Sequence, residues 1–285
     1  MKALKTWALV FMGGGARGLA HVGVIRVLEQ VGLVPDIVAG TSMGGLVGGL
    51  YAAGFSAARL TEMISGLDLD GGAGETGRHP LLKRAPNLFE SMFLSDTKNR
   101  LFTKFGLEKE DAIEAYLKKC VGNVRIEDLP VPFLCNAVDL ASGREILFTR
   151  GKLYRALRAT MSLPVVFEPV RMGRMILVDG GVLSSAPVEA AREAGAEVAV
   201  LVDIHRPLKR MPREKLQNTF HLIQRTVEVA TAASFSERAR HADFVIRIPI
   251  DQGVLQFSRP KAIVAKGERT ALAQLDALKK ALGAG

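Results

Sequence analysis

Two glycine-rich segments restrict the folds open to this chain, because each follows a short apolar run and precedes a helical pattern. The first is "FMGGGARGLAHVG" at residues 11–23, and the second is "IVAGTSMGGLVGG" at residues 37–49. Glycine is favoured where the backbone turns sharply or where another segment of backbone lies very close. The two segments therefore predict two strand–turn–helix units near the N-terminus.

The same alternation of strand and helix patterns continues along the chain. Strands are expected at residues 7–12, 36–40, 133–139, 145–148, 174–178, 197–203 and 243–248. Helices are expected at residues 17–32, 42–54, 56–66, 108–120, 151–162, 187–195, 215–240 and 260–282. Within the first helix, Val24, Leu28 and Val31 have the i, i+4, i+7 spacing of one buried face. This alternation predicts a three-layer α/β fold, in which helices flank a mainly parallel central sheet.

Length and composition suit one domain spanning residues 1–285. With 48% hydrophobic residues, a chain of 285 residues can bury a large core. Residues 67–107 lack clean periodicity, so we expect a loop-rich insertion there, either a lid or an ordinary excursion. Its phenylalanines would suit an acyl-chain groove or, by default, the core: Phe89, Phe93, Phe102 and Phe105.

Sequence features that bear on location favour a cytoplasmic protein, either soluble or peripherally bound to a membrane. The two cysteines, Cys120 and Cys135, do not make a disulfide framework. Lysines precede an apolar stretch at the N-terminus, but this stretch is too short for a signal peptide, and we interpret it as the first strand. No apolar run reaches the ~18 residues that a membrane helix needs.

The chain is basic, with a formal net charge of +9. Part of the excess lies in "HRPLKRMPREK" at residues 205–215, which would suit either an anionic membrane surface or a solvated loop. Nucleic acid is not expected as a partner, because the chain has no zinc finger, basic zipper or aromatic-rich sheet motif. The sequence leaves the oligomeric state open.

Ser42 lies in the pattern G-x-S-x-G, formed with Gly40 and Gly44. An apolar strand leads into it and a helical stretch follows, which is the context of a nucleophile elbow. In such a turn the hydroxyl is exposed to substrate, and the N-terminus of the following helix points unpaired N–H groups at the same place. This context favours a nucleophilic serine over a glycine-rich loop with an incidental serine.

The upstream loop "GGGARG" at residues 13–18 matches G-x-G-x-x-G, which by itself suggests a dinucleotide site. That site needs an acidic residue at the far end of the second strand, whereas Asp36 lies at its beginning. The other use of such a loop is an oxyanion hole built from backbone N–H groups. Arg17 is a cation in a helix's first turn, so we expect a carboxylate, a substrate anion or solvent to compensate its charge.

A serine nucleophile also needs a proton acceptor. Of the five histidines, His205 is the best candidate because it follows an apolar strand, whereas His21 is interpreted as packing or capping. The stronger candidate is Asp179, which directly follows the strand expected at 174–178 and precedes Gly180 and Gly181. Asp-Gly after a strand is also an ordinary turn, so the assignment depends on its combination with Ser42.

The glycine loop Gly13–Gly18, the serine motif Gly40–Gly44 and the run Asp179-Gly180-Gly181 together resemble the patatin-like phospholipases. "GLAHVGVIRVLEQVGL", "ALRATMSLPVVFEPV" and "LVDGGVLSSAPVEAAREAGAEVAVLVDI" are similar to the small bacterial members of that family. The resemblance covers most of residues 7–205 and is weak in 67–107 and beyond 205. It implies the patatin-like arrangement of the three-layer fold.

The resemblance also implies a Ser-Asp dyad without histidine, with Ser42 as nucleophile and Asp179 as base. The implied oxyanion hole consists of backbone N–H groups at Gly13, Gly14, Gly15 and Met43. The supporting positions are Arg17, Gly18, Gly40, Gly44, Gly180 and Gly181. The implied reaction is hydrolysis of lipid carboxylic esters, of phospholipase A or lysophospholipase type, through an acyl-enzyme and without a cofactor.

The proposed base raises a physical difficulty, since a carboxylate near its reference pKa of ~3.9 is a weak base for a serine hydroxyl. Partial burial beside Ser42 would raise the pKa of Asp179, while Arg17 close by would lower it. No metal is expected to assist, because no cluster of ligands has zinc or calcium spacing.

Other functions stay open at the level of sequence. A thioesterase or general carboxylesterase would share the mechanism and differ only in its leaving group. A regulatory or adaptor protein could keep the fold without acyl turnover, and a nucleotide-dependent oxidoreductase would bind NAD or NADP. The sequence does not give acyl-chain length, positional preference or head group.

Overall fold

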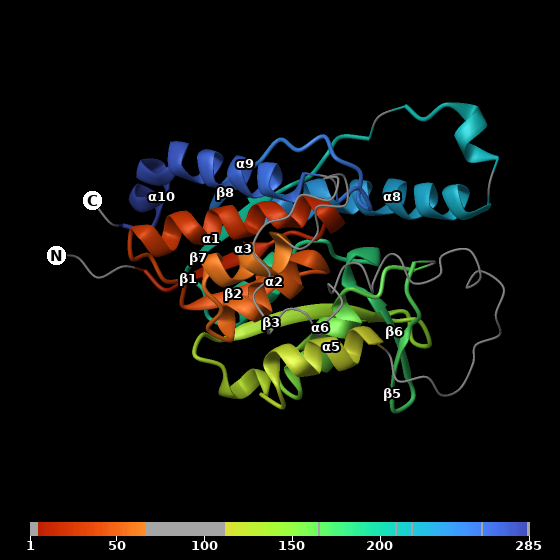
Figure 1. Ribbon diagram of the computed structural model, residues 1–285, viewed down its shortest axis with the longest axis horizontal. Coiled ribbons are helices and arrows are strands. Elements are labelled where there is room, and N and C mark those ends of the chain that lie inside the picture. Colours follow the sequence, from red (N-terminus) through yellow and green to blue (C-terminus); the bar gives the residue numbers. More distant parts are fainter. Residues whose placement is uncertain are drawn as a thin grey trace, which may run out of the picture.

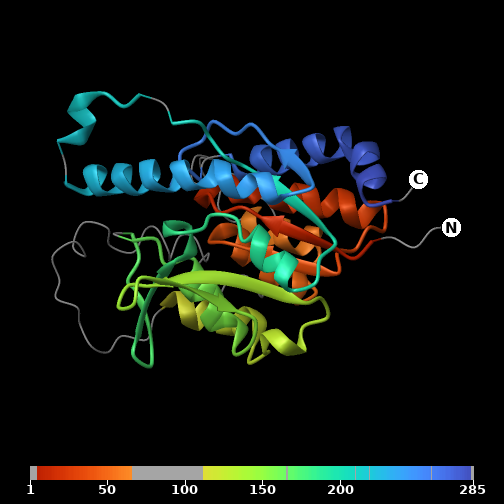
Figure 2. The ribbon, with the colours of Figure 1, turned by 180° about the vertical axis from the view of Figure 1, so that it is seen from behind.

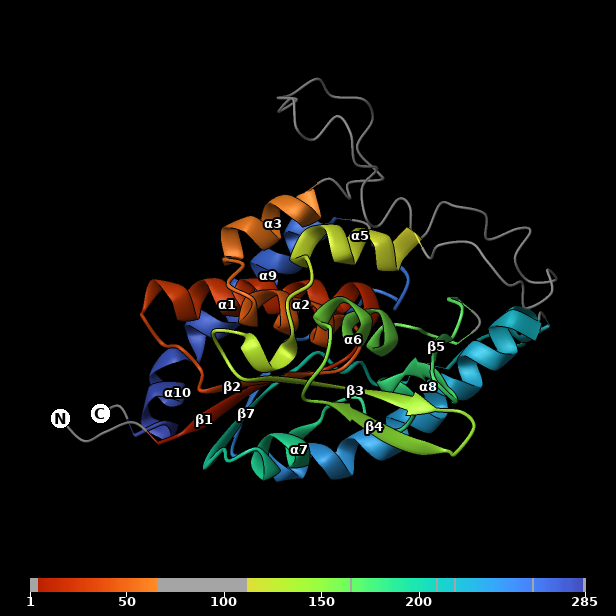
Figure 3. The same ribbon diagram turned by 90° about the horizontal axis from the view of Figure 1, so that it is seen from below.

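The computed structural model describes residues 5–65, 112–164, 166–208, 210–217, 219–257 and 259–283. These residues form an eight-stranded sheet with helices on both faces. In Figure 3, α1, α2 and α6 lie over one face of the sheet, and α7 and α8 lie over the other. The predicted three-layer α/β arrangement is confirmed, while the expected insertion at 67–107 and its phenylalanines lie outside the described residues.

The elements follow the predicted alternation (Figure 1). The strands are β1 (Trp7–Phe11), β2 (Ile37–Gly40), β3 (Phe133–Asp139), β4 (Arg144–Phe148), β5 (Val170–Met172), β6 (Met175–Asp179), β7 (Val198–Asp203) and β8 (Phe244–Arg247). The α-helices are α1 (Ala20–Gln30), α2 (Met43–Ala52), α3 (Ala57–Ser65), α5 (Ala112–Val121), α6 (Leu153–Thr160), α7 (Val188–Glu193), α8 (Thr219–Arg238), α9 (Pro260–Ala273) and α10 (Leu275–Ala281). The 3₁₀ turns are η1 (Gly15–Leu19), η3 (Ile126–Asp128), η4 (Gly180–Val182), η5 (Arg213–Leu216) and η6 (Ala239–His241).

Each predicted strand is present, and the differences concern short or interrupted elements. Strand β5 was not predicted, because a three-residue strand with a central arginine shows no period-2 pattern. The helix predicted at 260–282 is two helices, α9 and α10, which meet at Gln274. The helix predicted at 17–32 begins as the 3₁₀ turn η1, where Gly15 has φ 55°.

The sheet is parallel through β3, β2, β1, β7 and β8, while β4, β5 and β6 make only antiparallel pairings. The mainly parallel sheet is therefore confirmed, with an antiparallel portion beside β3. Parallel strands place their carboxyl ends along one edge of the sheet. The loops after β1, β2 and β7 consequently meet there.

Strand β3 has two partners on the same edge. Its first half pairs with β2, up to Cys135 opposite Gly40, and its second half pairs with β6, from Ala137 opposite Asp179. Strand β4 pairs with both halves and so occupies the other edge. Because β2 runs parallel and β6 antiparallel to β3, their carboxyl ends face each other. Figure 1 shows β2 and β6 along different halves of β3.

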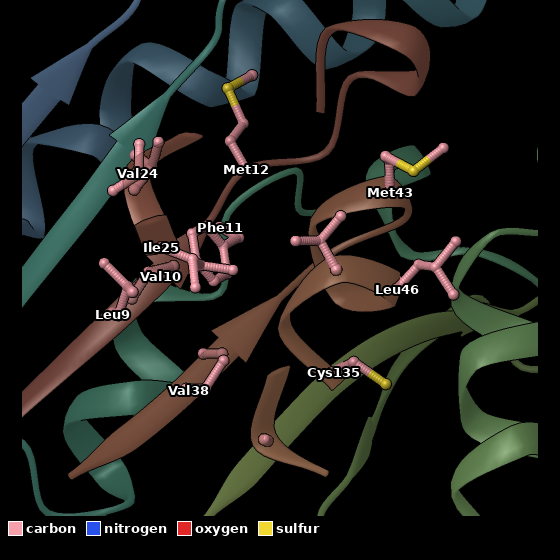
Figure 4. Close-up of a cluster of buried hydrophobic side chains, with 14 of the residues drawn as sticks. Leu9, Val10, Phe11, Met12, Val24, Ile25, Val38, Met43, Leu46 and Cys135 are labelled. Carbon is pink, nitrogen blue, oxygen red and sulfur yellow. The ribbon is translucent and has the colours of Figure 1, made fainter. Parts of the chain in front are cut away.

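The core lies on both sides of the central strand β1, which is buried along its whole length. Figure 4 shows Leu9, Val10 and Phe11 of this strand among side chains from α1, α2 and β2. A buried side chain of this size contributes ~1.5–3 kcal/mol relative to an exposed one. This packing fixes the helices that follow the two glycine-rich turns.

Glycines let two helices approach backbone closely. A Cβ at Gly44 in α2 would overlap the carbonyl oxygen of Phe11 in β1, so α2 lies directly against the sheet. In α1, a Cβ at Gly23 would overlap the carbonyl oxygen of Val264 in α9. The glycines of α2 therefore permit the close approach of this helix to β1. Among the described residues, no helix combines the length and apolar character needed to cross a bilayer.

Replacing Gly23 by alanine is expected to destabilise the fold by about 1–3 kcal/mol, although alanine favours a helix by ~1 kcal/mol over glycine. The added methyl group would push α9 away from α1. Urea unfolding measures the loss. Gly253→Ala is the matched control, because a Cβ there meets its nearest neighbour at 3.8 Å. Equal losses in the two variants would contradict the prediction.

Candidate active site

Ser42 occupies a sharp turn between β2 and α2. Its backbone angles are φ 55° and ψ −126°, in a region that non-glycine residues rarely adopt. A Cβ at Gly40 would lie 2.5 Å from the carbonyl oxygen of Gly44, so only glycine fits there. The Ser42 N–H donates to Thr160 Oγ1 at 2.8 Å, which helps to hold the turn. Such backbone strain costs on the order of 1–3 kcal/mol and is common at functional sites.

Asp179 lies opposite Ser42, at the end of β6. The Ser42 hydroxyl donates to Asp179 Oδ2 at 2.5 Å. The other carboxylate oxygen, Oδ1, accepts the N–H of Gly181 at 2.8 Å. The Asp179 backbone N–H donates to the carbonyl oxygen of Ser162. The carboxylate is thus held in one orientation by contacts on two sides.

Burial raises the pKa of Asp179 to about 6, and its side chain is among the buried polar groups. Hydrogen bonds from Ser42 and from the Gly181 N–H oppose this rise. Arg17 was expected to lower this pKa as well, but the two hydrogen bonds, and not Arg17, oppose the effect of burial. The carboxylate is therefore a stronger base than a solvated aspartate and is still mostly ionised near neutral pH.

A buried polar network lies behind the two residues. Thr41, next to Ser42, donates from Oγ1 to Asn136 Oδ1 at 2.8 Å. Asn136 Nδ2 donates to the Ser184 carbonyl oxygen at 2.9 Å and to Glu145 Oε1 at 2.6 Å. Asn136 also explains Gly180, because a Cβ there would overlap the Asn136 side chain. Sequence reasoning missed this residue, and the only signal was one amide in the apolar run "FLCNAVD".

The glycine loop lies beside the serine, which is where the implied oxyanion hole would have to be. A Cβ on Gly13 would lie 3.3 Å from Ser42 Cβ. The Gly13 N–H is already used, since it donates to the Ser185 carbonyl oxygen at 2.8 Å. Within the described ranges, the N–H groups of Gly14 and Gly15 have no hydrogen-bond partner. Gly14 and Gly15 are therefore better placed than Gly13 to donate to a ligand.

The start of α2 adds a further donor position. Met43 is the first residue of α2, where helix geometry leaves the backbone N–H without an intrahelical acceptor. A Cβ at Gly18 would overlap the Met43 side chain, so η1 packs tightly against this helix end. Met43 and Gly18, which were both named from the sequence, therefore lie where the glycine loop meets the serine turn.

Arg17 lies at the same place with its side chain partly buried. Its Nε donates to the Gly14 carbonyl oxygen at 3.3 Å. Burial lowers the pKa of Arg17, as does Arg206, while Glu228 and Asp203 raise it. Across the part of the chain described here, Arg17 makes no ion pair with a carboxylate. Among the described residues, the carboxylates that act on its charge, Glu228 and Asp203, do so at longer range.

The histidines take other roles in this arrangement. His21 is fully buried, and its Nε2 lies 2.8 Å from the Met12 carbonyl oxygen, just before the glycine loop. Burial lowers the pKa of His21 to about 4, so the ring is neutral and Nε2 donates this bond. His205 lies in the wall of a cavity, and the hydroxyl of Ser42 donates to Asp179 instead. His21 therefore packs, as expected, and supports the loop.

A cavity of about 860 Å³ opens over Ser42 and Asp179. Its walls come from several parts of the chain: the glycine loop, the segment after α6, η4, the segment between β7 and η5, α8 and residues 252–257. The volume is within the range of ligand pockets, ~300–1,000 Å³. Sequence reasoning gave residues 252–257 no role, because nothing local marks them. Among the described residues, no group of three or more His, Cys, Asp or Glu is arranged to hold a metal ion.

The fold and the matched sequence identify the family. The family model for patatin-like phospholipases matches residues 9–192, and the chain belongs to this family. The fold is similar to the crystal structure of VipD from Legionella pneumophila, with a TM-score of 0.53 and 14% identity. That match covers 97% of this chain and 67% of VipD. The predicted resemblance and the α/β fold are therefore confirmed.

Two relatives have comparable similarity in sequence. The chain is 30% identical over 293 residues to "Lysophospholipase NTE1" of Mycosarcoma maydis, covering 94% of this chain and 14% of that protein. It is 32% identical over 198 residues to an uncharacterized NTE family protein of Mycobacterium bovis, covering 70% of this chain and 49% of that protein. The chain thus spans less than half the length of each of these two relatives.

Asp179→Asn is expected to stabilise the protein by roughly 3 kcal/mol at about pH 7 and to have little effect at about pH 4. Burial raises the pKa of Asp179 in the folded state to about 6, so the folded state binds the proton more tightly. The wild type therefore loses stability as the pH rises from about 4 to about 6, while asparagine cannot ionise. Urea unfolding at both pH values measures the difference.

Asp139→Asn is the control of opposite sign. Hydrogen bonds from Ser142 and from the Ile176 N–H lower the pKa of Asp139, so its ionised form stabilises the fold. This variant should lose stability at neutral pH. If Asp179→Asn also loses stability at neutral pH, the pKa of Asp179 is not raised by folding.

Proposed function

We propose that this chain hydrolyses carboxylic esters of lipids, with Ser42 as nucleophile and Asp179 as base. The observation that supports this most directly is the 2.5 Å hydrogen bond from the Ser42 hydroxyl to Asp179 Oδ2, in the wall of the cavity. The strained turn at Ser42 and the elevated pKa of Asp179 agree with it. Membership of the patatin-like phospholipase family supports a lipid hydrolase.

In the proposed first step, Asp179 takes the proton of Ser42 while Oγ attacks the acyl carbonyl carbon. Negative charge then develops on the carbonyl oxygen, and the N–H groups of Gly14, Gly15 and Met43 would donate to it. Each such donor lowers the barrier by about 3 kcal/mol. When the tetrahedral intermediate collapses, the bond to the leaving alcohol breaks and the proton on Asp179 passes to that alcohol.

The second step reverses these roles with water. Asp179 takes a proton from a water molecule, whose oxygen attacks the Ser42 acyl ester. Collapse releases the carboxylic acid and returns the proton to Ser42 Oγ. Because the pKa of Asp179 is about 6, the carboxylate is ionised for the attack and its conjugate acid is strong enough to protonate an alkoxide.

The substrate class follows from the walls of the cavity. Apolar side chains from several elements line it, among them Met161, Leu163, Phe167, Val254 and Phe257. Such a lining suits an acyl chain. We propose a substrate of phospholipase A or lysophospholipase type, in keeping with the name of the M. maydis relative, a lysophospholipase. Lipid substrates of this kind are concentrated in membranes, so we further propose that the chain associates peripherally with a membrane surface.

A fluorophosphonate probe is expected to form an adduct on Ser42, located by peptide mass spectrometry. Ser42→Ala should remove the adduct, and both Ser42→Ala and Asp179→Asn should reduce turnover of a soluble short-chain ester by a thousandfold or more, an order-of-magnitude expectation for residues that act together. Ser142→Ala is the matched control, because Ser142 lies in the turn after β3 and not in the cavity.

A folded wild-type protein with neither adduct nor turnover would overturn the proposed hydrolase. Retained turnover in Asp179→Asn would keep the nucleophile but remove the aspartate from its role as base. Faster turnover of thioesters than of oxygen esters with the same acyl chain would assign the chain as a thioesterase with the same dyad.

The pH profile tests the base separately. For the soluble ester, kcat/KM is expected to rise with pH to a plateau, with its midpoint near the raised pKa of Asp179, about 6. A midpoint near pH 4, the range of a solvated carboxylate, would contradict the role of burial. A midpoint that disappears in His205→Gln would assign the base to His205 instead.

A further inference from the structure

Exposed apolar side chains gather beside the cavity. Of the ten exposed large hydrophobic side chains in the described part of the chain, five lie at position 183 or between 208 and 229. They are Leu183, Leu208, Leu222, Ile223 and Val229. Leu208 and Ile223 line the cavity, and Leu183 directly follows η4, which contacts α8. The remaining five are spread over other parts of the molecule.

Cationic side chains accompany this apolar group. Residues 205–215 contain five Lys and Arg against a single glutamate. Arg206 and Arg210 line the cavity, and Arg213 is exposed at the start of η5. In α8 itself, the charge of Arg225 is balanced by Glu228 at 3.1 Å. The excess positive charge therefore belongs to the segment before α8.

Both groups lie at one end of the molecule. Figures 1 and 2 show η5 and the first half of α8 projecting beyond the sheet, at the end opposite α10. Leu222 and Val229 are seven residues apart on α8 and so share one face of the helix. Leu222 is 51% exposed and Val229 is 48% exposed, so the described residues leave much of this face uncovered.

An anionic bilayer would satisfy both kinds of side chain. Leucine and isoleucine side chains gain free energy by entering the boundary between head groups and acyl chains, while arginines bind the negative surface. A nucleic acid would bind only the cations and leave the apolar side chains in water. Several exposed apolar side chains beside a ligand cavity are typical of an interaction site.

We propose that Leu208, Arg210, Arg213, Leu222 and Ile223 form a docking surface for an anionic lipid bilayer. This proposal rests on the proposed lipid hydrolase and names the surface through which that site would meet its substrate. Residues of the basic segment and of α8 line the cavity, so docking places this part of its walls against the bilayer. A lipid would then reach Ser42 without its acyl chain passing through water.

The test uses the full chain and two double variants. Arg213→Glu with Leu222→Ser changes one cation and one apolar side chain of the docking surface, and neither residue lines the cavity. Arg269→Glu with Leu272→Ser is the matched control, since both residues are exposed on α9 and Leu272 lies close to α10. Co-sedimentation is measured with vesicles of phosphatidylglycerol and phosphatidylcholine, and with phosphatidylcholine alone, at low and high salt.

The wild type and the α9 variant are expected to bind the anionic vesicles, more weakly at high salt and on phosphatidylcholine alone. The docking-surface variant should bind roughly tenfold more weakly or worse. All three should hydrolyse a soluble short-chain ester equally. No vesicle binding by the wild type, or equal binding by both variants, would overturn the docking surface.

Two further outcomes separate the docking surface from the proposed hydrolase and from binding to a nucleic acid. If the wild type does not hydrolyse the soluble ester, the proposed hydrolase is overturned. Vesicle binding that is weakened in the docking-surface variant would still support the docking surface. Binding of duplex DNA that depends on Arg213, with no vesicle binding, would overturn the bilayer in favour of a nucleic acid.

Discussion

The hydrogen bonds along one edge of β3 determine where the two central side chains of this protein lie. Strand β2 approaches along that edge from one direction and β6 from the other, and their carboxyl ends stop two positions apart along β3. Ser42 and Asp179 are more than a hundred residues apart in sequence, yet their strands leave them almost no freedom of separation. The 2.5 Å hydrogen bond between them follows from strand register.

Ser42 and Asp179, which lie at or just beyond the ends of β2 and β6, both lower the stability of the fold. Ser42 has a positive φ angle that only strong neighbouring contacts can impose, and Asp179 is a carboxylate removed from water. The central strand β1, buried throughout, and the tight packing of α2 against it supply the rigidity that holds both in place. The buried amide of Asn136 connects the serine turn to the segment after Asp179, so the strained residues share one network.

Sequence reasoning located features that have local causes. The order of strand, glycine and helix around Ser42 and the Asp-Gly-Gly after β6 are visible in short windows, as is each strand longer than three residues. The features it missed depend on contacts between distant segments. Thr160 and Asn136 are ordinary residues in their own windows, and residues 252–257 carry no periodic pattern. The occupied N–H of Gly13 likewise depends on Ser185, far along the chain.

One of those distant contacts bears on the smallest unit that can keep this arrangement. The family match ends at residue 192, but the Ala16 N–H in η1 donates to the carbonyl oxygen of Val254, which also lies against Gly15. The strand β7 beside β1 and the helix α9 against α1 come from the same later region. A chain cut at the family boundary would keep every residue of the motif and lose the backbone that shapes its loop. The motif and the working unit of this protein therefore have different lengths.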